Sequence, residues 1–155
     1  MDDAIDAVLS IDKSAGLTSM DVVRRVKRLV GQRHVGHGGT LDPQARGVLP
    51  IFLGKATRII EYLEGTAKVY QADLLLGIET DTYDKEGRLQ GSRDASAVTL
   101  RDVEEHLTAF QGAIRQIPPM FSALHHKGRR LYELARAGVE VEREARWVTI
   151  HRLGI

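Results

Sequence analysis

One amphipathic segment restricts the folds open to this chain more than any other feature. In residues 20–30, five apolar side chains recur at helical spacing, so a helix there must bury one face. The hydroxyl residues at 18–19 can cap this helix. Residues 7–11 and 48–53 are short apolar runs that predict strands, and Pro50 predicts that the second is an edge strand or carries a bulge.

The rest of the chain alternates further strand and helix signals. Residues 68–78 give the longest strand signal, and residues 147–155 give another. Helices are predicted at 100–110, after a capping pattern, and at about 130–137, with an irregular stretch over 114–130. This mixture predicts an α+β fold in which helices pack beside a mixed or antiparallel central sheet.

Composition matters mainly for what it excludes. The 155 residues contain no cysteine, which rules out disulfides, thiolate nucleophiles and cysteine-based zinc sites. No apolar run approaches the ~20 residues that cross a bilayer, and the acidic N-terminus is unlike a signal peptide, so we expect a cytoplasmic protein without a membrane partner. Net charge is only +1, so a nucleic-acid binder would have to concentrate its positive charge locally.

The segment from Val35 to Pro50 holds the clearest candidate site. Glycines on both sides of His37 let the backbone approach a ligand closely. Pro43 biases Asp42 towards an extended or turn conformation. A carboxylate held on a rigid loop before a buried strand suits a nucleophile or a base. By residue types alone, however, an Asp-Pro turn is usually a simple turn and not a site.

The order of residues in this loop resembles the signature of TruB-type pseudouridine synthases. In that family Gly-His-x-Gly-x-Leu-Asp-Pro is followed by Gly-x-Leu-Pro, as in residues 36–50 here. The family's opening motif, the segment after its catalytic loop, its substrate-stacking tyrosine strand and its RNA-gripping insert also have counterparts. These lie at residues 12–19, 53–58, 68–70 and within 114–141.

The resemblance implies that a uridine in the T-loop of tRNA is isomerised to pseudouridine. The N-glycosidic bond breaks, the uracil turns, and a carbon–carbon bond forms to the same sugar, so no cofactor or metal is needed. Asp42 is then the catalytic carboxylate, acting either as nucleophile or as base. His37 is implied to contact the RNA near the target base, and Tyr70 to stack on the extruded base.

The densest basic run lies in the expected insert at about 114–141. Lys127, Arg129 and Arg130 follow a Pro-Pro-Met-Phe turn, and loops that grip RNA combine charge with exposed apolar groups. We therefore expect these three residues to bind the T-arm of tRNA. The alternative is an ordinary solvated surface.

The chain departs from the family pattern at three points. Ser14 stands where the family usually has proline, and Gly38 where it usually has threonine. A later Lys-Gly-Thr-Tyr-Ile-Arg-like motif, whose arginine pairs with the catalytic aspartate, has no counterpart. We expect residues 1–155 to be part of a catalytic domain whose C-terminal remainder is absent, to require that remainder as a partner, and to be inactive alone.

Two other classes of function stay open at this stage. One is an RNA-binding fragment or tRNA-shaping module without catalysis, which the missing arginine motif favours. The other is a carboxylate-dependent nucleoside or glycoside hydrolase, although the sequence offers no convincing second carboxylate motif.

Overall fold

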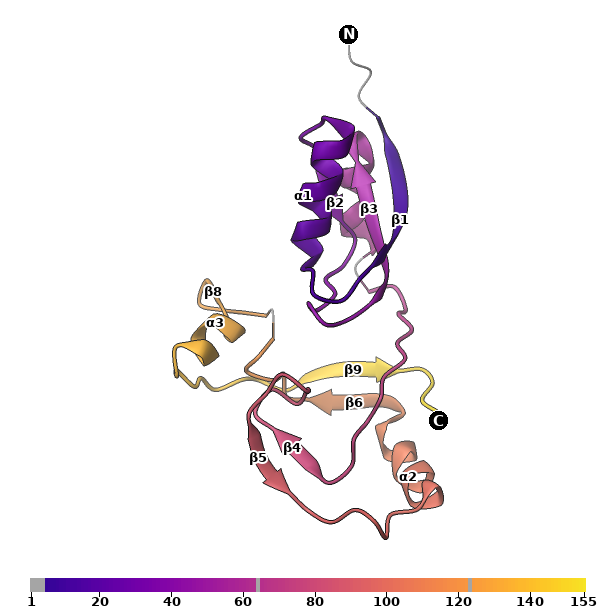
Figure 1. Ribbon diagram of the computed structural model, residues 1–155, viewed down its shortest axis with the longest axis vertical. Coiled ribbons are helices and arrows are strands. Elements are labelled where there is room, and N and C mark those ends of the chain that lie inside the picture. Colours follow the sequence, from indigo (N-terminus) through magenta and orange to yellow (C-terminus); the bar gives the residue numbers. More distant parts are fainter. Residues whose placement is uncertain (1–4, 64, 123) are drawn as a thin grey trace. The chain divides into compact units, whose positions relative to one another are not determined.

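A computed structural model describes residues 5–63, 65–122 and 124–155 of the chain (Figure 1). They divide into two compact units, Met1–Gln71 and Ala72–Ile155. The first unit carries the glycine-rich loop, and the second carries the basic run.

The first unit is a small antiparallel sheet with one α-helix against it. In the strand order β1-β3-β2, both outer strands pair with β3 in antiparallel register. Figure 1 shows α1 lying along this sheet. The elements are β1 (Ala7–Lys13), α1 (Ser19–Val30), β2 (Val35–His37), β3 (Gly47–Leu53) and the 3₁₀ helix η1 (Gly54–Leu63).

Alternation along β3 explains how this unit forms a core. Side chains two apart on a strand share a face, so Leu49, Ile51 and Leu53 point together, and each is at most 1% exposed. They pack against one stripe of α1, as the helical periodicity predicted. The buried cluster comprises Val22, Val23, Val26, Val35, Leu49, Ile51 and Leu53.

Both ends of α1 are fixed by residues that the sequence identifies. Thr18 is the N-cap and forms a reciprocal capping box with Asp21, in which each side chain bonds to the other residue's backbone N–H. Gly31 ends the helix at φ 68°, a left-handed conformation that suits glycine. The helix predicted at 20–30 is therefore confirmed.

Pro50 lies in the central strand of the sheet, so the prediction of an edge strand was wrong. Its carbonyl accepts a hydrogen bond from the N–H of Gly38 at 2.9 Å, on the side where β2 ends at His37. Within a strand the N and the carbonyl of one residue face the same neighbour. The N atom of Pro50 therefore also faces the β2 side, just beyond the last residue of β2. Its lack of a hydrogen removes no hydrogen bond between β3 and β1.

The second unit consists of two-stranded antiparallel ribbons and short helices. Its strands pair as β4 with β5, β6 with β9, and β7 with β8. Its elements are β4 (Ile78–Thr80), β5 (Leu89–Ser92), α2 (Leu100–Leu107), the 3₁₀ turn η2 (Thr108–Phe110), β6 (Gly112–Gln116), β7 (His125–His126), β8 (Arg129–Arg130), α3 (Leu131–Arg136) and β9 (Arg146–Ile150).

The helices of this unit differ in how much they bury. Thr99 and Asp102 cap α2 with the predicted reciprocal box, yet α2 contains no buried residue. In contrast, α3 buries Leu131 and Leu134, which are 3% and 6% exposed. The short helix predicted near 130–137 is confirmed, and it gives the expected insert a small core of its own.

Two strand predictions differ from the structure. Residues 68–77 form no strand, and Val69 is 98% exposed, because no strand in the described part of the chain lies beside them to accept their backbone hydrogen bonds. The last strand was predicted to run to residue 155, but β9 ends at Ile150. This residue pairs with Gly112, the first residue of β6. The mixed α+β character is confirmed, and a larger central sheet stays a prediction.

Part of the stretch predicted to be irregular is ordered. Residues 114–130 contain most of β6 and the small hairpin of β7 and β8. The hairpin is closed by Lys127 and Gly128, with φ of 48° and 82°, which suits a tight two-residue turn. A lysine in this conformation is uncommon, and the sequence pattern gave too short a strand signal to identify it.

Candidate functional site

Asp42 lies in the loop that joins β2 to β3. Its side chain is exposed, and within the described residues no hydrogen bond or ion pair engages its carboxylate. Its carbonyl accepts from the N–H of Ala45 at 3.0 Å, which closes a turn over Pro43. The carboxylate is therefore presented to solvent from a closed turn.

The residue before Asp42 is held by a serine at the start of α1. The N–H of Leu41 donates to Ser19 Oγ at 2.9 Å, and the Ser19 hydroxyl donates to the Leu41 carbonyl at 3.1 Å. Ser19 is only 3% exposed, and the Leu41 side chain packs against the core cluster. Both the backbone and the side chain of Leu41 are therefore anchored.

The residue after Asp42 is held by the last residue of β1 and by the segment that follows it. The carbonyl of Pro43 accepts from the N–H of Gly16 at 2.8 Å and from Lys13 Nζ at 3.2 Å. Lys13 Nζ also donates to the carbonyls of Leu17, at 2.7 Å, and Ser14, at 3.2 Å. The loop is thus fixed on both sides of the carboxylate.

Lys13 is an unusual anchor because it is a charged residue that is only 1% exposed. Buried lysines normally pair with a carboxylate. Here three backbone carbonyls accept its three N–H bonds, so the ammonium group is satisfied by the loops it joins.

His37 ends β2, five residues before Asp42, and is half-buried. The N–H of Gly39 donates to His37 Nδ1 over a long 3.4 Å. Because Nδ1 is engaged by the loop itself, Nε2 is the ring nitrogen that an outside partner would meet. The two residues share one loop, and the structure records no direct bond between them.

The glycine beside His37 has a packing role. A Cβ at Gly38 would lie 2.7 Å from Cε2 of Phe52, a side chain that is 2% exposed. Phe52 thus occupies the space that a side chain at position 38 would need. The chain has glycine at position 38, where the resemblance implies threonine, and the Phe52 ring explains why a side chain does not fit there.

Tyr70 is not brought to the loop by any recorded interaction. It lies in the irregular segment after η1 and is 69% exposed. In the described part of the chain, no hydrogen bond joins it to Asp42 or His37. Its predicted stacking role rests on the resemblance alone.

The three basic residues predicted to bind RNA differ in placement. Lys127 lies at the tip of the β7–β8 hairpin and is exposed, as is Arg129. Arg130 is half-buried, and its N–H donates to Glu133 Oε2 at 3.3 Å at the start of α3. Two of these side chains are therefore presented to solvent, and the third lies at a helix end.

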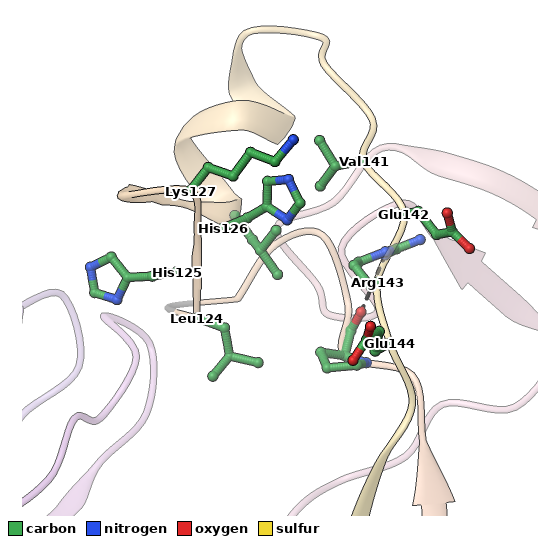
Figure 2. Close-up of a pocket in the computed structure, with 10 residues that line it drawn as sticks. Leu124, His125, His126, Lys127, Val141, Glu142, Arg143 and Glu144 are labelled. Carbon is green, nitrogen blue, oxygen red and sulfur yellow. Dashed lines mark hydrogen bonds between the residues drawn. The ribbon is translucent and has the colours of Figure 1, made fainter.

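A hollow of about 690 Å³ lies beside this hairpin. Figure 2 shows Lys127 and His126 on one side of it and Arg143 on the other, with the ring of His125 pointing away. Arg143 donates through Nη1 to the carbonyl of Pro118 at 3.2 Å and pairs with Glu140 at 3.6 Å. The hollow is lined by apolar residues and by charges of both signs, contributed by Pro118, Leu124, Leu131, Val141, Lys127, Glu142, Arg143 and Glu144.

The described residues offer neither a cluster of metal ligands nor a membrane-spanning helix. Among them, no three histidine, aspartate or glutamate side chains are grouped so that they could ligate a metal ion. None of their helices has the length and apolar character needed to cross a bilayer.

Sequence analysis missed the two anchors, Lys13 and Ser19. In the sequence, Lys13 stands out only as part of the segment at residues 12–19 that resembles the family's opening motif, and Ser19 only as one of two hydroxyl residues that can cap α1. One signal was present: a helix needs a single capping hydroxyl, and Thr18 supplies it. The second hydroxyl therefore had another use.

The sequence pattern that defines the N-terminal domain of TruB family pseudouridylate synthases matches residues 27–155. The chain belongs to the TruB family. Among the curated relatives of this TruB chain is tRNA pseudouridine synthase B of Dehalococcoides mccartyi strain BAV1, 53% identical over 95% of the chain and 49% of that protein. The proteins of the same name from Moorella thermoacetica and Symbiobacterium thermophilum are both 52% identical, over 92% and 96% of the chain and 47% and 50% of theirs.

A solved structure is also similar to the chain. A chain of a crystal structure of a Cbf5-Nop10-Gar1 complex is similar, with a TM-score of 0.51 and 30% sequence identity. The similarity covers 79% of the TruB chain and 32% of that chain. The chain spans about half the length of the curated relatives it matches.

Proposed function

We propose that this TruB-family chain takes part in converting a uridine in the T-loop of tRNA to pseudouridine, with Asp42 as the catalytic carboxylate. Family membership supports the reaction class. The finer assignments, namely the T-loop position and the aspartate, rest on the motif of residues 36–50 together with the geometry of that loop. The proposal includes a cytoplasmic location.

The chemistry needs a group that acts at the sugar or at its hydrogens. The N1–C1′ bond of the uridine breaks, and a C5–C1′ bond forms after the uracil turns. The hydrogen of C5 is released and N1 acquires one, so atoms and electrons balance without a redox partner. A carboxylate can trap the electron-poor sugar carbon or remove a proton from the sugar, and both routes stay open for Asp42.

The single observation that carries the proposal is the anchoring of the Asp42 loop. Its backbone is held by Ser19 before the carboxylate and by Lys13 and Gly16 after it, while the carboxylate itself is exposed. Rigid presentation of an accessible reactive group is what catalysis requires. A simple surface turn would not need a buried lysine to hold it.

The substrate contacts form the second part of the proposal. His37, at the end of β2, would meet the RNA beside the target base, and the exposed ring of Tyr70 would stack on that base after extrusion. Lys127 and Arg129 would bind phosphates from the β7–β8 hairpin, with Arg130 contributing at its base.

The decisive experiment replaces the carboxylate by its neutral isostere. Asp42→Asn is expected to abolish pseudouridine formation, read as release of tritium from 5-tritiated uridine in a T-arm RNA, and to leave RNA affinity within about 3-fold. Loss of a group that acts in the transition state lowers kcat rather than binding. Glu61→Gln removes another exposed carboxylate from the same unit and is the matched control.

Retention of more than a few per cent of wild-type turnover by Asp42→Asn would exclude Asp42 as the catalytic residue. A large loss of RNA affinity would instead make it a binding or structural residue. Because the chain spans about half the length of the curated relatives it matches, turnover is to be measured in the 155 residues both alone and with the expected C-terminal remainder supplied.

A non-catalytic RNA-binding module is the second candidate. It is favoured by one observation: within the described residues no cation pairs with Asp42, although a partner would keep such a carboxylate ionised and oriented. RNA binding without tritium release by the wild-type protein, with the expected C-terminal remainder supplied, would support this candidate over the first.

A further inference from the structure

Asp42 is joined to its neighbours through two peptide planes, and these two and the next plane along the chain are each tied by hydrogen bonds. Because a peptide unit is planar, fixing its oxygen fixes the orientation of the whole plane. The plane before Asp42 carries the Leu41 carbonyl, the plane after it carries the Asp42 carbonyl, and the next carries the Pro43 carbonyl. Together they set the direction in which the Asp42 side chain leaves the backbone.

The three carbonyls differ in how many donors bind them. The Pro43 carbonyl has two donors, Gly16 N–H and Lys13 Nζ, so loss of one leaves the other. The Asp42 carbonyl is bound by Ala45 through the turn itself. In the described part of the chain, the Leu41 carbonyl is bound by Ser19 alone, and the same hydroxyl also accepts from the Leu41 N–H.

We infer that Ser19 is a positioning residue for Asp42: its hydroxyl fixes the peptide plane from which the carboxylate departs. The inference rests on the proposed catalytic role of Asp42. The hydroxyl connects the first turn of α1 to a loop 22 residues away, and it is buried where water could not replace it readily. Without it, the plane before Asp42 can rotate while the rest of the loop stays in place.

Helix stability does not explain the hydroxyl. The cap of α1 is Thr18, whose side chain accepts from the Asp21 N–H at 3.1 Å. Ser19 already lies inside the helix, where alanine is the more favourable residue. A substitution of Ser19 by alanine therefore separates the effect on the loop from an effect on the helix.

The test compares Ser19→Ala with Thr18→Ala, a neighbouring hydroxyl that touches the helix but not the loop. For Ser19→Ala, kcat is expected to fall about 10-fold to 100-fold, since a misplacement near 1 Å costs about that much. KM and the Kd for a T-arm RNA are expected to change less than about 2-fold. Ser19→Thr, which keeps a hydroxyl, should recover most of kcat. Thr18→Ala should lower the melting temperature and leave kcat within about 2-fold.

Hydrogen exchange of the Leu41 amide gives a readout that is independent of turnover. It should be protected in the wild-type protein and exchange faster in Ser19→Ala, because Ser19 Oγ is its acceptor. Faster exchange with unchanged kcat would overturn the positioning role and leave Ser19 a structural residue. A kcat loss equal to that of Thr18→Ala would also overturn it. All turnover is measured with the expected C-terminal remainder supplied as a partner, and absence of turnover by the wild-type protein under that condition would refute the proposed function instead.

Discussion

The ammonium group of Lys13 lies 3.2 Å from the carbonyl oxygen of Pro43, thirty residues further along the chain. Lys13 is the last residue of β1, and Pro43 follows Asp42 directly. The bond therefore links the first strand of the sheet to the loop that carries the candidate carboxylate. It also explains why a lysine is buried without an acidic partner.

We predict that Lys13→Met lowers stability more than activity. The substitution preserves most of the chain volume but leaves the carbonyls of Leu17 and Pro43 without their charged donor. The Pro43 carbonyl keeps the Gly16 N–H, whereas the Leu17 carbonyl loses its donor. A buried acceptor without a partner costs about 1–3 kcal/mol, partly offset because the ammonium no longer has to be desolvated. A net loss of about 1–3 kcal/mol corresponds to roughly 3–10 °C in melting temperature for a protein of this size.

Turnover by Lys13→Met, measured well below the melting temperature, should stay within about 10-fold of wild type, because the Gly16 N–H still holds Pro43. Lys55→Met, at an exposed lysine of the same unit, is the control for loss of charge. An unchanged melting temperature for Lys13→Met would contradict the assignment of Lys13 as a structural anchor.

The close approach of Gly38 and Phe52 gives a second prediction. Gly38→Ala should destabilise the protein by about 1–3 kcal/mol, the usual range for overpacking, because its Cβ would meet the ring of Phe52. Phe52→Leu should destabilise by a similar amount through the cavity it leaves. The double variant should be less damaged than the sum of the two.

Denaturant unfolding of the four proteins in this cycle measures the coupling between positions 38 and 52. Gly91→Ala, where the nearest atom to the new Cβ is 3.8 Å away, serves as the matched control and should be nearly neutral. Additive losses from Gly38→Ala and Phe52→Leu would contradict the contact.

The sequence predicted the parts of this protein that depend on local pattern. The buried stripe of α1 followed from the spacing of Val22, Val23 and Val26, and the Asp42 loop from its glycines, Pro43 and the motif they form. These features repeat within a few residues, so periodicity and turn chemistry identify them.

Contacts between distant residues could not be predicted in this way. The two bonds between Ser19 and Leu41 join positions 22 apart, and nothing in either neighbourhood marks them as partners. The strand expected at 68–78 failed for a related reason: its apolar residues satisfy the strand pattern, but a strand forms only beside another. The roles of His37, Tyr70, Lys127, Arg129 and Arg130 stay predictions.

A pH dependence follows from the capping box of α1. Hydrogen bonds from the Thr18 side chain and backbone hold the pKa of the Asp21 carboxyl below its ordinary value of 3.8. A carboxyl whose pKa is lower in the folded state stabilises that state above its unfolded pKa, and this contribution is lost as the pH falls through the folded pKa. We therefore expect α1 to lose stability below about pH 4.

The measurement compares melting temperatures of wild type and Asp21→Asn between pH 7 and pH 2.5. The gap should be largest near neutral pH and should close at the acid end, since asparagine has no charge to lose. Asp73→Asn, at an exposed aspartate outside any helix cap, controls for the general effect of charge removal. A gap that stays constant over the whole range would contradict the role of the Asp21 charge.

The hairpin of β7 and β8 gives the last prediction, which concerns RNA binding. Lys127 at the tip and Arg129 in β8 are exposed, whereas Arg130 is half-buried at the start of α3. The double variant Lys127→Ala/Arg129→Ala therefore tests charge without disturbing that helix. Alanine and lysine both carry a Cβ, so the substitution adds no strain to the left-handed backbone at position 127. If both side chains bind phosphates, the slope of log affinity against log salt should fall by about 1.4–1.8, two contacts at roughly 0.7–0.9 each. The matched control, Lys85→Ala/Arg93→Ala, removes two exposed charges from the same unit and should leave the slope unchanged. Equal slopes for both double variants would make the hairpin a solvated surface, and binding of the T-arm would then have to depend on the loop of His37 and Asp42 instead.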